Sequence, residues 1–340
     1  MVTSRDVARV AGVAQSTVSY VMSGRRSISP ETRRRVEAAI EQLTYQPNAG
    51  ARALASQRTN VIGLVVPFAR GVDTVGLLPF IETITGCARA ADHDVLLVTA
   101  DEQSAGLTRL AGRSLCDAIV MMDIEADDQR IPVAAALRIP FILIGIPNDP
   151  AGLACVDLDF ELAGRMAVDE LATTRHDRVV VIGHPAEVIA RDVNFVRRFA
   201  RGVAAAAAQH DLAYDVLAPV GPGRDGAAAV VADALAGHTP GSRLGMIIPN
   251  SQAVARVQQA VIDRGLVPGR DVSIVGLCTD VAAEATTPTI TNVSTEPRDV
   301  SRRAMQILFT LLDRDREPPA AGIELVAPRL TRRQTTMPAP

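Results

Sequence analysis

The stretch that decides the fold opens the chain, where residues 3–24 read TSRDVARVAGVAQSTVSYVMSG. Its first half predicts a short helix, because Thr3 can cap the N-terminus, Asp6 can complete a capping box and Gly12 can end the helix. A second helix is predicted from about Gln15 to Met22. Two short helices joined by a tight turn have the spacing of a helix-turn-helix, a motif that places its second helix in the major groove of DNA.

The second predicted helix presents polar, uncharged side chains on its outward face, namely Gln15, Ser16, Ser19 and Tyr20. Such side chains can form hydrogen bonds with the edges of base pairs. An ordinary helical hairpin inside a larger core is the alternative interpretation. The segments that follow argue against it, because they add further parts of a DNA-binding device.

A third helix is predicted from Ser29, Pro30 and Glu31, a favourable start signal, to about Leu43. Residues 1–60 hold nine arginines against four acidic residues, a net charge of +5, whereas the rest of the chain carries −8. A basic head on an acidic body indicates a polyanionic partner at one end, although arginine clusters can also be solvated helix faces. The chain has no lysine, which excludes a P-loop lysine and Schiff-base chemistry.

Residues 46–55 read QPNAGARALA, a run of small residues with helical propensity that Pro47 opens. A helix this short does not persist alone in water, but it can fold when it packs against a symmetry mate and a DNA groove. Leu54 is its single large apolar side chain, and insertion between base steps of a minor groove is one physical use for it. A flexible linker with a stray leucine is the alternative.

The composition bounds the class of protein. With 340 residues, 48% of them hydrophobic, the chain is globular and has room for two or three domains. We find no apolar run long enough to span a membrane and no signal-peptide core, and we therefore expect a cytoplasmic protein. The four cysteines lie far apart, which predicts reduced, buried thiols. We expect no catalytic residues, no cofactor and no metal, and hence no enzyme.

From Val61 onward, short apolar strands alternate with helices. Strands are predicted at residues 61–66, 95–99, 118–121, 141–144, 178–182, 244–248 and 272–275. Helices are predicted at residues 79–91, 162–172, 197–209, 253–264 and 300–312. This alternation predicts two α/β lobes, each built on a doubly wound parallel sheet.

The headpiece, together with the segment Tyr45 to Leu54 (YQPNAGARAL), resembles the LacI family of bacterial transcription regulators. The resemblance is specific over residues 1–60 and looser to about residue 335. It implies a small all-α helix-turn-helix headpiece and a two-lobed α/β core like that of the periplasmic binding proteins. The implied divisions are a headpiece at 1–46, a hinge helix and linker at 47–60, and an effector-binding and dimerisation domain at 61–335. Within that domain, the expected N-lobe is about 61–158 and 291–320, and the expected C-lobe is about 159–290 and 321–335.

By this resemblance, Gln15 and Ser16 open the recognition helix and read bases, and Leu54 is the minor-groove lever of the hinge helix. The full set of expected DNA contacts is Thr3, Gln15, Ser16, Thr17, Ser19, Tyr20, Asn48, Ala51 and Leu54. This chain has Ala14 where many members have a capping serine, and Tyr20 where many have an arginine. Tyrosine cannot grip a guanine with two hydrogen bonds, so the operator preference must differ at that step.

The same resemblance places a ligand, a sugar by default, in the cleft between the lobes. The expected effector contacts are Phe68, Asp159, Arg197, Arg198, Asn250 and Asp280. Phe199 occupies the position of the family's pocket arginine, so Arg197 and Arg198 are neighbouring candidates. Leu277 and Cys278 stand where the family often has a phenylalanine and a ligand-binding aspartate. The absence of tryptophan also removes the best surface for stacking on a sugar.

We therefore expect a repressor that binds double-stranded operator DNA of near-palindromic sequence as a homodimer or a tetramer. A small-molecule effector is expected to control that binding. Two other classes stay open, a two-lobed α/β enzyme and a sugar-sensing binding protein that does not regulate DNA. The enzyme would turn over substrate without the headpiece, and the binding protein would lack salt-dependent DNA affinity.

Overall fold

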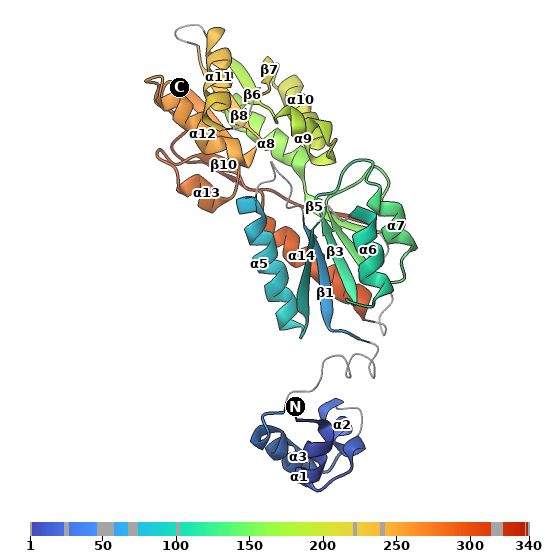
Figure 1. The fold of residues 1–340 in the computed structure, drawn as a ribbon. Coiled ribbons are helices and arrows are strands. Elements are labelled where there is room, and N and C mark those ends of the chain that lie inside the picture. The colour runs from blue at the N-terminus through green and yellow to red at the C-terminus, as the bar shows by residue number, and fades with distance from the viewer. Residues whose placement is uncertain are drawn as a thin grey trace. The chain divides into compact units, whose positions relative to one another are not determined.

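The computed structural model describes residues 2–23, 27–45, 58–66, 74–99, 103–219, 223–238, 242–313, 322–336 and 338. These residues form two compact units, one ending at Asn60 and one starting at Val61 (Figure 1). The part of the first unit that is described is helical, and the second unit contains two six-stranded sheets. In these ranges no helix has both the length and the apolar character needed to span a bilayer.

The described part of the first unit has three helices: α1 (Ser4–Ala11), α2 (Gln15–Ser23) and α3 (Pro30–Gln42). The expected start of α1 is confirmed, because the Thr3 N–H and hydroxyl donate to the Asp6 carboxylate at 3.0 and 2.7 Å. These hydrogen bonds from Thr3 hold the pKa of Asp6 below its ordinary value. Gly12 ends α1 with a φ of 63°, a left-handed conformation that glycine adopts without steric cost.

Small apolar side chains from all three helices form the headpiece core. Its buried members are Val7, Ala8, Ala11, Val18, Val21, Val36 and Ala39. Arg35 lies outside the apolar stripe of α3, yet its guanidinium donates to the Ala11 carbonyl at 2.7 and 3.1 Å and to the Gly12 carbonyl at 2.9 Å. These carbonyls end α1 and have no partner within their own helix. Arg35 therefore ties α3 to α1.

The second unit begins with a lobe built on a parallel sheet, as far as the structure describes it, in the order β11-β5-β4-β3-β1-β2. Its strands are β1 (Val61–Val66), β2 (Asp94–Thr99), β3 (Ala118–Met122), β4 (Phe141–Ile144), β5 (Ala154–Leu158) and β11 (Ile323–Val326). One face is covered by α5 (Thr74–Ala90) and α14 (Pro297–Leu312). The other face is covered by α6 (Gln103–Gly112) and α7 (Arg130–Ala136).

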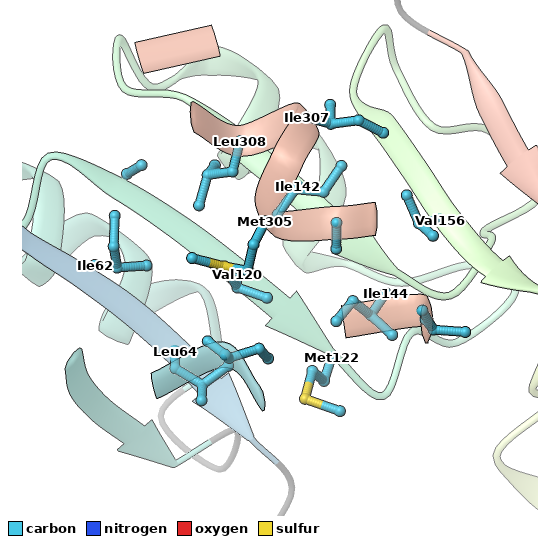
Figure 2. Packing of buried hydrophobic residues seen from close by; sticks show 14 of the residues in the cluster. Ile62, Leu64, Val120, Met122, Ile142, Ile144, Val156, Met305, Ile307 and Leu308 are labelled. Atoms are coloured by element: carbon cyan, nitrogen blue, oxygen red, sulfur yellow. The ribbon is translucent and has the colours of Figure 1, made fainter. Parts of the chain in front are cut away.

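The core beneath α14 explains why a helix from the end of the chain belongs to the first lobe. Figure 2 shows Met305 and Leu308 of α14 beside strand residues such as Val120 and Ile142. All four side chains are at most 1% exposed. Fully burying a side chain of this size contributes about 1.5–3 kcal/mol relative to leaving it in water, so this helix is firmly docked.

The second lobe has its own sheet in the order β12-β10-β9-β8-β6-β7, in which β12 runs antiparallel to β10. Its strands are β6 (Arg178–Ile182), β7 (Tyr214–Leu217), β8 (Leu244–Ile248), β9 (Val272–Leu277), β10 (Thr291–Val293) and β12 (Leu330–Thr331). The helices on one face are α8 (Phe160–Thr173) and α10 (Asn194–Gln209), and those on the other are α11 (Gly223–Ala236) and α12 (Ser251–Ile262). Two short helices, α9 (Ala186–Ala190) and α13 (Asp280–Glu284), follow β6 and β9.

The division between the lobes differs from the expected one near the C-terminus. The residues of β10 were expected in the first lobe, but β10 pairs with β9 of the second sheet. The residues of β11 were expected in the second lobe, but β11 pairs with β5 of the first sheet. The described chain therefore crosses between the lobes after β5, after β10 and after β11. A short apolar run does not reveal which sheet it joins, because the pairing partner lies far away in the sequence.

The helix after β1 also differs from the expectation. It starts at Thr74 rather than at Pro79, and Pro79 lies inside it. The Pro79 carbonyl accepts a hydrogen bond from the Thr83 hydroxyl at 2.7 Å. Proline is a common first-turn residue, so it marked a plausible start, but the helical pattern continues on its N-terminal side.

Helices α8 and α10 approach each other closely because each has a glycine at the contact. A Cβ atom added to Gly164 would lie 2.4 Å from the Phe199 carbonyl oxygen, and one added to Gly202 would lie 1.9 Å from the Glu161 carbonyl oxygen. Both opposing atoms belong to the backbone and cannot rotate away. Any side chain at either position would therefore force the two helices apart.

The substitution Gly202→Ala tests this contact. We expect it to lower the free energy of unfolding by about 3 kcal/mol, the upper end of the cost of overpacking, in urea titrations followed by circular dichroism. Gly112→Ala is the matched control, because Gly112 ends α6 and an added Cβ there meets no atom within 4 Å. The control should change the unfolding free energy by no more than about 0.5 kcal/mol. Equal stability of the two variants would contradict the close packing.

Candidate DNA interface and interlobe site

The outward face of α2 carries the polar side chains that were predicted for it. Among the expected DNA contacts, Thr3, Gln15, Ser16 and Ser19 are exposed, and Thr17 and Tyr20 are partly buried. Val18 of the same helix is fully buried in the headpiece core, which fixes the face that α2 turns outward. The remaining expected contacts, Asn48, Ala51 and Leu54, lie outside the described residues.

Gln15, the first residue of α2, is oriented by α1. Its side-chain nitrogen donates to the Ser4 hydroxyl at 2.8 Å, and Arg5 Nε donates to its side-chain oxygen at 3.4 Å. An amide has two donor hydrogens and two acceptor lone pairs, so these bonds leave capacity for a base. Because the amide is already oriented, contact with a base would cost it little side-chain entropy.

Ala14, the residue before α2, gives this helix no side-chain cap. The Ala14 carbonyl accepts hydrogen bonds from the Thr17 and Val18 N–H groups at 2.9 and 3.3 Å, but the methyl side chain offers no oxygen to the first turn. A helix N-terminus of this kind suits a phosphate, because its N–H groups and its dipole favour a negative charge. Alanine in place of a capping serine at position 14 therefore weakens the N-terminal cap of α2. The N–H groups at this end of the helix can still bind a phosphate of the DNA backbone.

In the second unit, an ion pair joins the two lobes beside α9. The Arg191 guanidinium, which follows α9, donates to Asp123 at 2.5 Å and to Glu125 at 3.2 Å. Both acids follow β3 of the first lobe. Arg191 is 34% exposed and Asp123 is 21% exposed, so water reaches this ion pair.

Neutral hydrogen bonds reinforce the same junction. The Ala126 N–H donates to the Asp192 carbonyl at 2.9 Å, and the Asn194 side chain donates to the Ile146 carbonyl, also at 2.9 Å. Asn194 also donates to the side chain of Asn148 at 3.2 Å. We call the ion pair of Arg191 and these three bonds the interlobe latch.

Arg198 of α10 makes a second link, to the carboxyl end of β5. It donates to the Asp157 carboxylate and, at 3.2 Å, to the Leu158 carbonyl. Its side chain is 11% exposed and that of Asp157 is 12% exposed. Burial raises the pKa of Asp157 to about 6, against the lowering effect of the Arg198 charge. The guanidinium also lies 5.4 Å from the ring centroid of Phe160, a cation–π distance.

Two of the expected effector contacts, Asp159 and Arg198, line one open pocket of about 560 Å³ where the lobes meet. The first lobe contributes Ile146, Ile323 and Leu325 to the lining, and the second contributes Glu161, Leu162, Arg165 and Arg201. Asp159 also caps α8, because its carboxylate accepts from the Leu162 N–H at 2.9 Å.

Asn250 and Asp280 lie at the carboxyl ends of two neighbouring strands, β8 and β9. Asn250 caps α12, where its side-chain oxygen accepts from the Gln252 N–H at 3.2 Å. Asp280 opens α13 and forms an ion pair with Arg333 at 3.1 Å. It also accepts a hydrogen bond from Asn292 at 3.2 Å. Both polar groups therefore already have partners that hold them at this sheet edge.

The remaining expected effector contacts lie elsewhere, and so do the two positions at which this chain departs from the family's pocket residues. Arg197 forms an ion pair with Asp192 on the exposed side of α10, and Phe68 lies outside the described residues. Phe199 is 4% exposed and packs in the core under α8 and α10. Cys278 is buried, and burial raises the pKa of its thiol to about 12, so it stays protonated. The expectation of free, buried thiols is confirmed for Cys116, Cys155 and Cys278, whereas the free Cys87 is only partly buried.

Sequence reasoning missed an aromatic cluster and the interlobe latch. Phe195 lies 5.1 Å from Phe160 and 5.7 Å from His184 between ring centroids. His184 follows β6, a strand-end position that could have drawn notice, as could the acids after β3. Arg191 gave no signal, because the short helix before it has no readable period.

The fold and the site define a helix-turn-helix unit joined to a two-lobed core of the periplasmic-binding-protein type. The signature of the bacterial regulatory proteins of the lacI family matches residues 3–48, and that of the periplasmic binding protein-like domain matches residues 168–336. The chain belongs to the LacI family of bacterial transcription regulators.

Individual relatives agree with this assignment. The HTH-type transcriptional regulator AglR of Rhizobium meliloti (strain 1021) is 32% identical over 217 residues, which span 62% of this chain and 59% of AglR. Catabolite control protein A of Priestia megaterium is 24% identical over 98% of this chain and 99% of its own length. The structure of the lac repressor dimer bound to operator and the anti-inducer ONPF superposes with a TM-score of 0.82 at 22% identity, covering 99% of each chain. At that identity, the structural similarity establishes the fold alone.

His184 should make the second unit sensitive to acid. Burial lowers its pKa from 6.5 to about 4, so between these values the unfolded chain binds more protons than the folded one. The contribution of His184 to stability is therefore fully present above pH 6.5 and is lost as the pH falls through about 4. The largest loss is about 3 kcal/mol.

We expect His184→Phe, which keeps a ring beside Phe195, to flatten the unfolding free energy between pH 4 and 6.5. Urea titrations at a series of pH values measure the difference between the two curves. Some slope should remain in the variant, because burial also lowers the pKa of His176. Parallel curves for the two proteins would show that His184 is not the acid-sensitive group.

Proposed function

We propose that this protein is a repressor that binds a near-palindromic DNA operator as a homodimer, with an affinity set by a small molecule bound between its lobes. The observation that carries the proposal is the outward polar face of α2, which begins with an oriented Gln15 beside Arg5. Family members are transcription regulators rather than enzymes, and no catalytic step is assigned. Because its proposed partner is chromosomal DNA, we place the protein in the cytoplasm.

The charge distribution supports contact with DNA at one end only. The first 60 residues carry a net charge of +5, and the remaining 280 carry −8 within an overall charge of −3. Arginines near phosphates release counterions, so the affinity should fall steeply with salt. The acidic body repels the phosphates and leaves recognition to the headpiece.

A dimer face is supported by apolar side chains that the second unit leaves exposed. Leu78 of α5 is 60% exposed, and Leu97 of the edge strand β2 is 41% exposed. Leu97 lies on the face of the sheet that α5 covers, because it is two residues from Val95, which packs in the core under α5 and α14. We propose that α5 and the β2 edge meet their counterparts in the partner subunit, since exposed apolar surface on an edge strand favours association.

The small molecule is a sugar or a related metabolite by family resemblance. The lac repressor structure holds operator DNA and ONPF together, and we transfer that pairing of partners to this chain. Asn250 and Asp280, which follow the neighbouring strands β8 and β9, are the proposed polar contacts on the second lobe. An effector that favours one lobe arrangement over the other would change the DNA affinity by that difference in binding free energy.

The substitution Gln15→Ala tests base reading. We expect it to weaken operator binding by about 1–3 kcal/mol and to relax the preference at one position of each half-site. Selection from random duplexes followed by titration at fixed salt measures both effects. Gln42→Ala, at the exposed end of α3, is the matched control and should leave the preference intact. Uniform weakening on all sequences would contradict base reading, and a wild-type chain that selects no sequence would overturn the proposed function.

The substitution Leu78→Asp tests the dimer face. A buried, unpaired carboxylate at a subunit interface is strongly unfavourable, so we expect the variant to sediment as a monomer at concentrations where the wild type is a dimer. Val267→Asp is the control, because Val267 is 41% exposed on the other lobe. A Leu78→Asp protein that remains dimeric in analytical ultracentrifugation would place the interface elsewhere.

A further inference from the structure

An apolar pocket of about 280 Å³ lies within the second lobe, separate from the pocket between the lobes. Helices α9 and α10 form one side of it, and strands β6 and β7 form the other. The residues that matter below are Ile189 of α9, Phe199 and Ala200 of α10, Tyr214 and Val216 of β7, and His184 after β6. We call this cavity the α9 pocket.

The pocket exists because α10 covers β7 incompletely. Strand β7 is the edge strand of its sheet. Tyr214 and Val216 are two residues apart on this strand, so their side chains lie on the same face of the sheet. Tyr214 is 37% exposed, Val216 is 62% exposed, and Ile189 across the pocket is 52% exposed. Large apolar side chains that surround a concavity and remain open to water are typical of a ligand site.

The lining determines which ligands fit. Among the described residues, no aspartate, glutamate or arginine lines the pocket. His184 is uncharged at neutral pH, because burial lowers its pKa to about 4. An apolar cavity of about 150 Å³ holds benzene, so one nearly twice that size holds a bicyclic ring. The imidazole of His184 and the phenol of Tyr214 can each form a hydrogen bond with such a ligand.

The α9 pocket is mechanically connected to the interlobe latch. None of the five residues of α9, all of them described, is buried, so few contacts hold this helix in place. Ile189 lines the pocket, and Arg191, two residues later, holds Asp123 of the first lobe. A molecule that fills the space under α9 therefore supports the segment from which the latch is made.

We propose that the α9 pocket is a second ligand site, which takes a small, uncharged, mostly aromatic molecule with one hydrogen-bonding group. Binding there favours the latched arrangement of the lobes. A ligand shifts an equilibrium toward the state it binds better, and the pocket is formed in the latched arrangement. The lining of this site shares no residue with the pocket between the lobes.

Indole and the full-length chain test the binding site. We expect indole to bind the wild type in isothermal titration calorimetry, and Ala200→Leu to weaken that binding at least tenfold by filling the pocket. Ala204→Leu is the matched control, because both alanines are exposed on α10 but only Ala200 lines the pocket. Circular dichroism verifies that both variants are folded. No binding to the wild type, or equal affinity in all three proteins, would overturn the site.

Amide hydrogen exchange tests the connection to the latch. The Ala126 N–H, which donates to the Asp192 carbonyl across the lobes, reports directly on the latch. We expect saturating indole to slow its exchange severalfold in the wild type, and not in Arg191→Gln, which still binds indole. Indole binding without slower exchange of Ala126 would overturn the coupling. Because these measurements contain no DNA, a failure of the proposed repressor function would leave their outcome unchanged.

Discussion

The contact between Gly164 and Gly202 is the constraint on which the second unit depends. Backbone meets backbone there, so α10 cannot slide or rotate on α8 without a clash. Helix α8 begins directly after the first crossing between the lobes, and α10 begins at the interlobe latch. Fixing one helix against the other therefore sets the distance between crossing and latch. The same helix α10 carries the latch residue Asn194 and the partly buried Arg198, which donate to the Ile146 and Leu158 carbonyls of the first lobe.

The two ionic links between the lobes differ in strength because they differ in burial. Arg198 and Asp157 are 11% and 12% exposed, and removing one partner of a buried pair costs about 3–5 kcal/mol. Arg191 is 34% exposed, and solvent-exposed ion pairs contribute only about 0–1 kcal/mol. Separation of the lobes should therefore begin at the latch and turn about the crossing at Asp157. A change of pH or the binding of a ligand should therefore alter the lobe arrangement most at the latch, because the latch is the weaker of the two links.

Local signals predicted the three headpiece helices and the central strands of both lobes, but not the strands β5, β7, β10, β11 and β12. Thr3 and Asp6 start α1 as the capping pattern indicates, because a cap is decided within four residues. The residues of β11 were not predicted as a strand and were expected in the wrong lobe, since their partner β5 is more than 150 residues away in the sequence. The same difference between local signals and long-range contacts applies to the site residues. Arg198 was expected only as a neighbour of the family's pocket position, and its role toward an effector stays a prediction. Its partner Asp157 and the latch residue Arg191 are defined by contacts that only the folded chain brings together.

Phe199 has a place in both proposed ligand sites, in one by its family position and in the other by the pocket that it lines. By resemblance to the LacI family, this position holds an arginine that binds the effector between the lobes. Here the side chain is buried in the core of the second lobe and lines the α9 pocket. Replacing a guanidinium by a phenyl ring removes a polar clamp from the cleft, because no donor remains at that position. The same replacement supplies apolar surface to the cavity behind it. Under the two proposals, a weaker hold on a hydroxyl-rich effector and a better fit for an aromatic ligand both follow from this one residue.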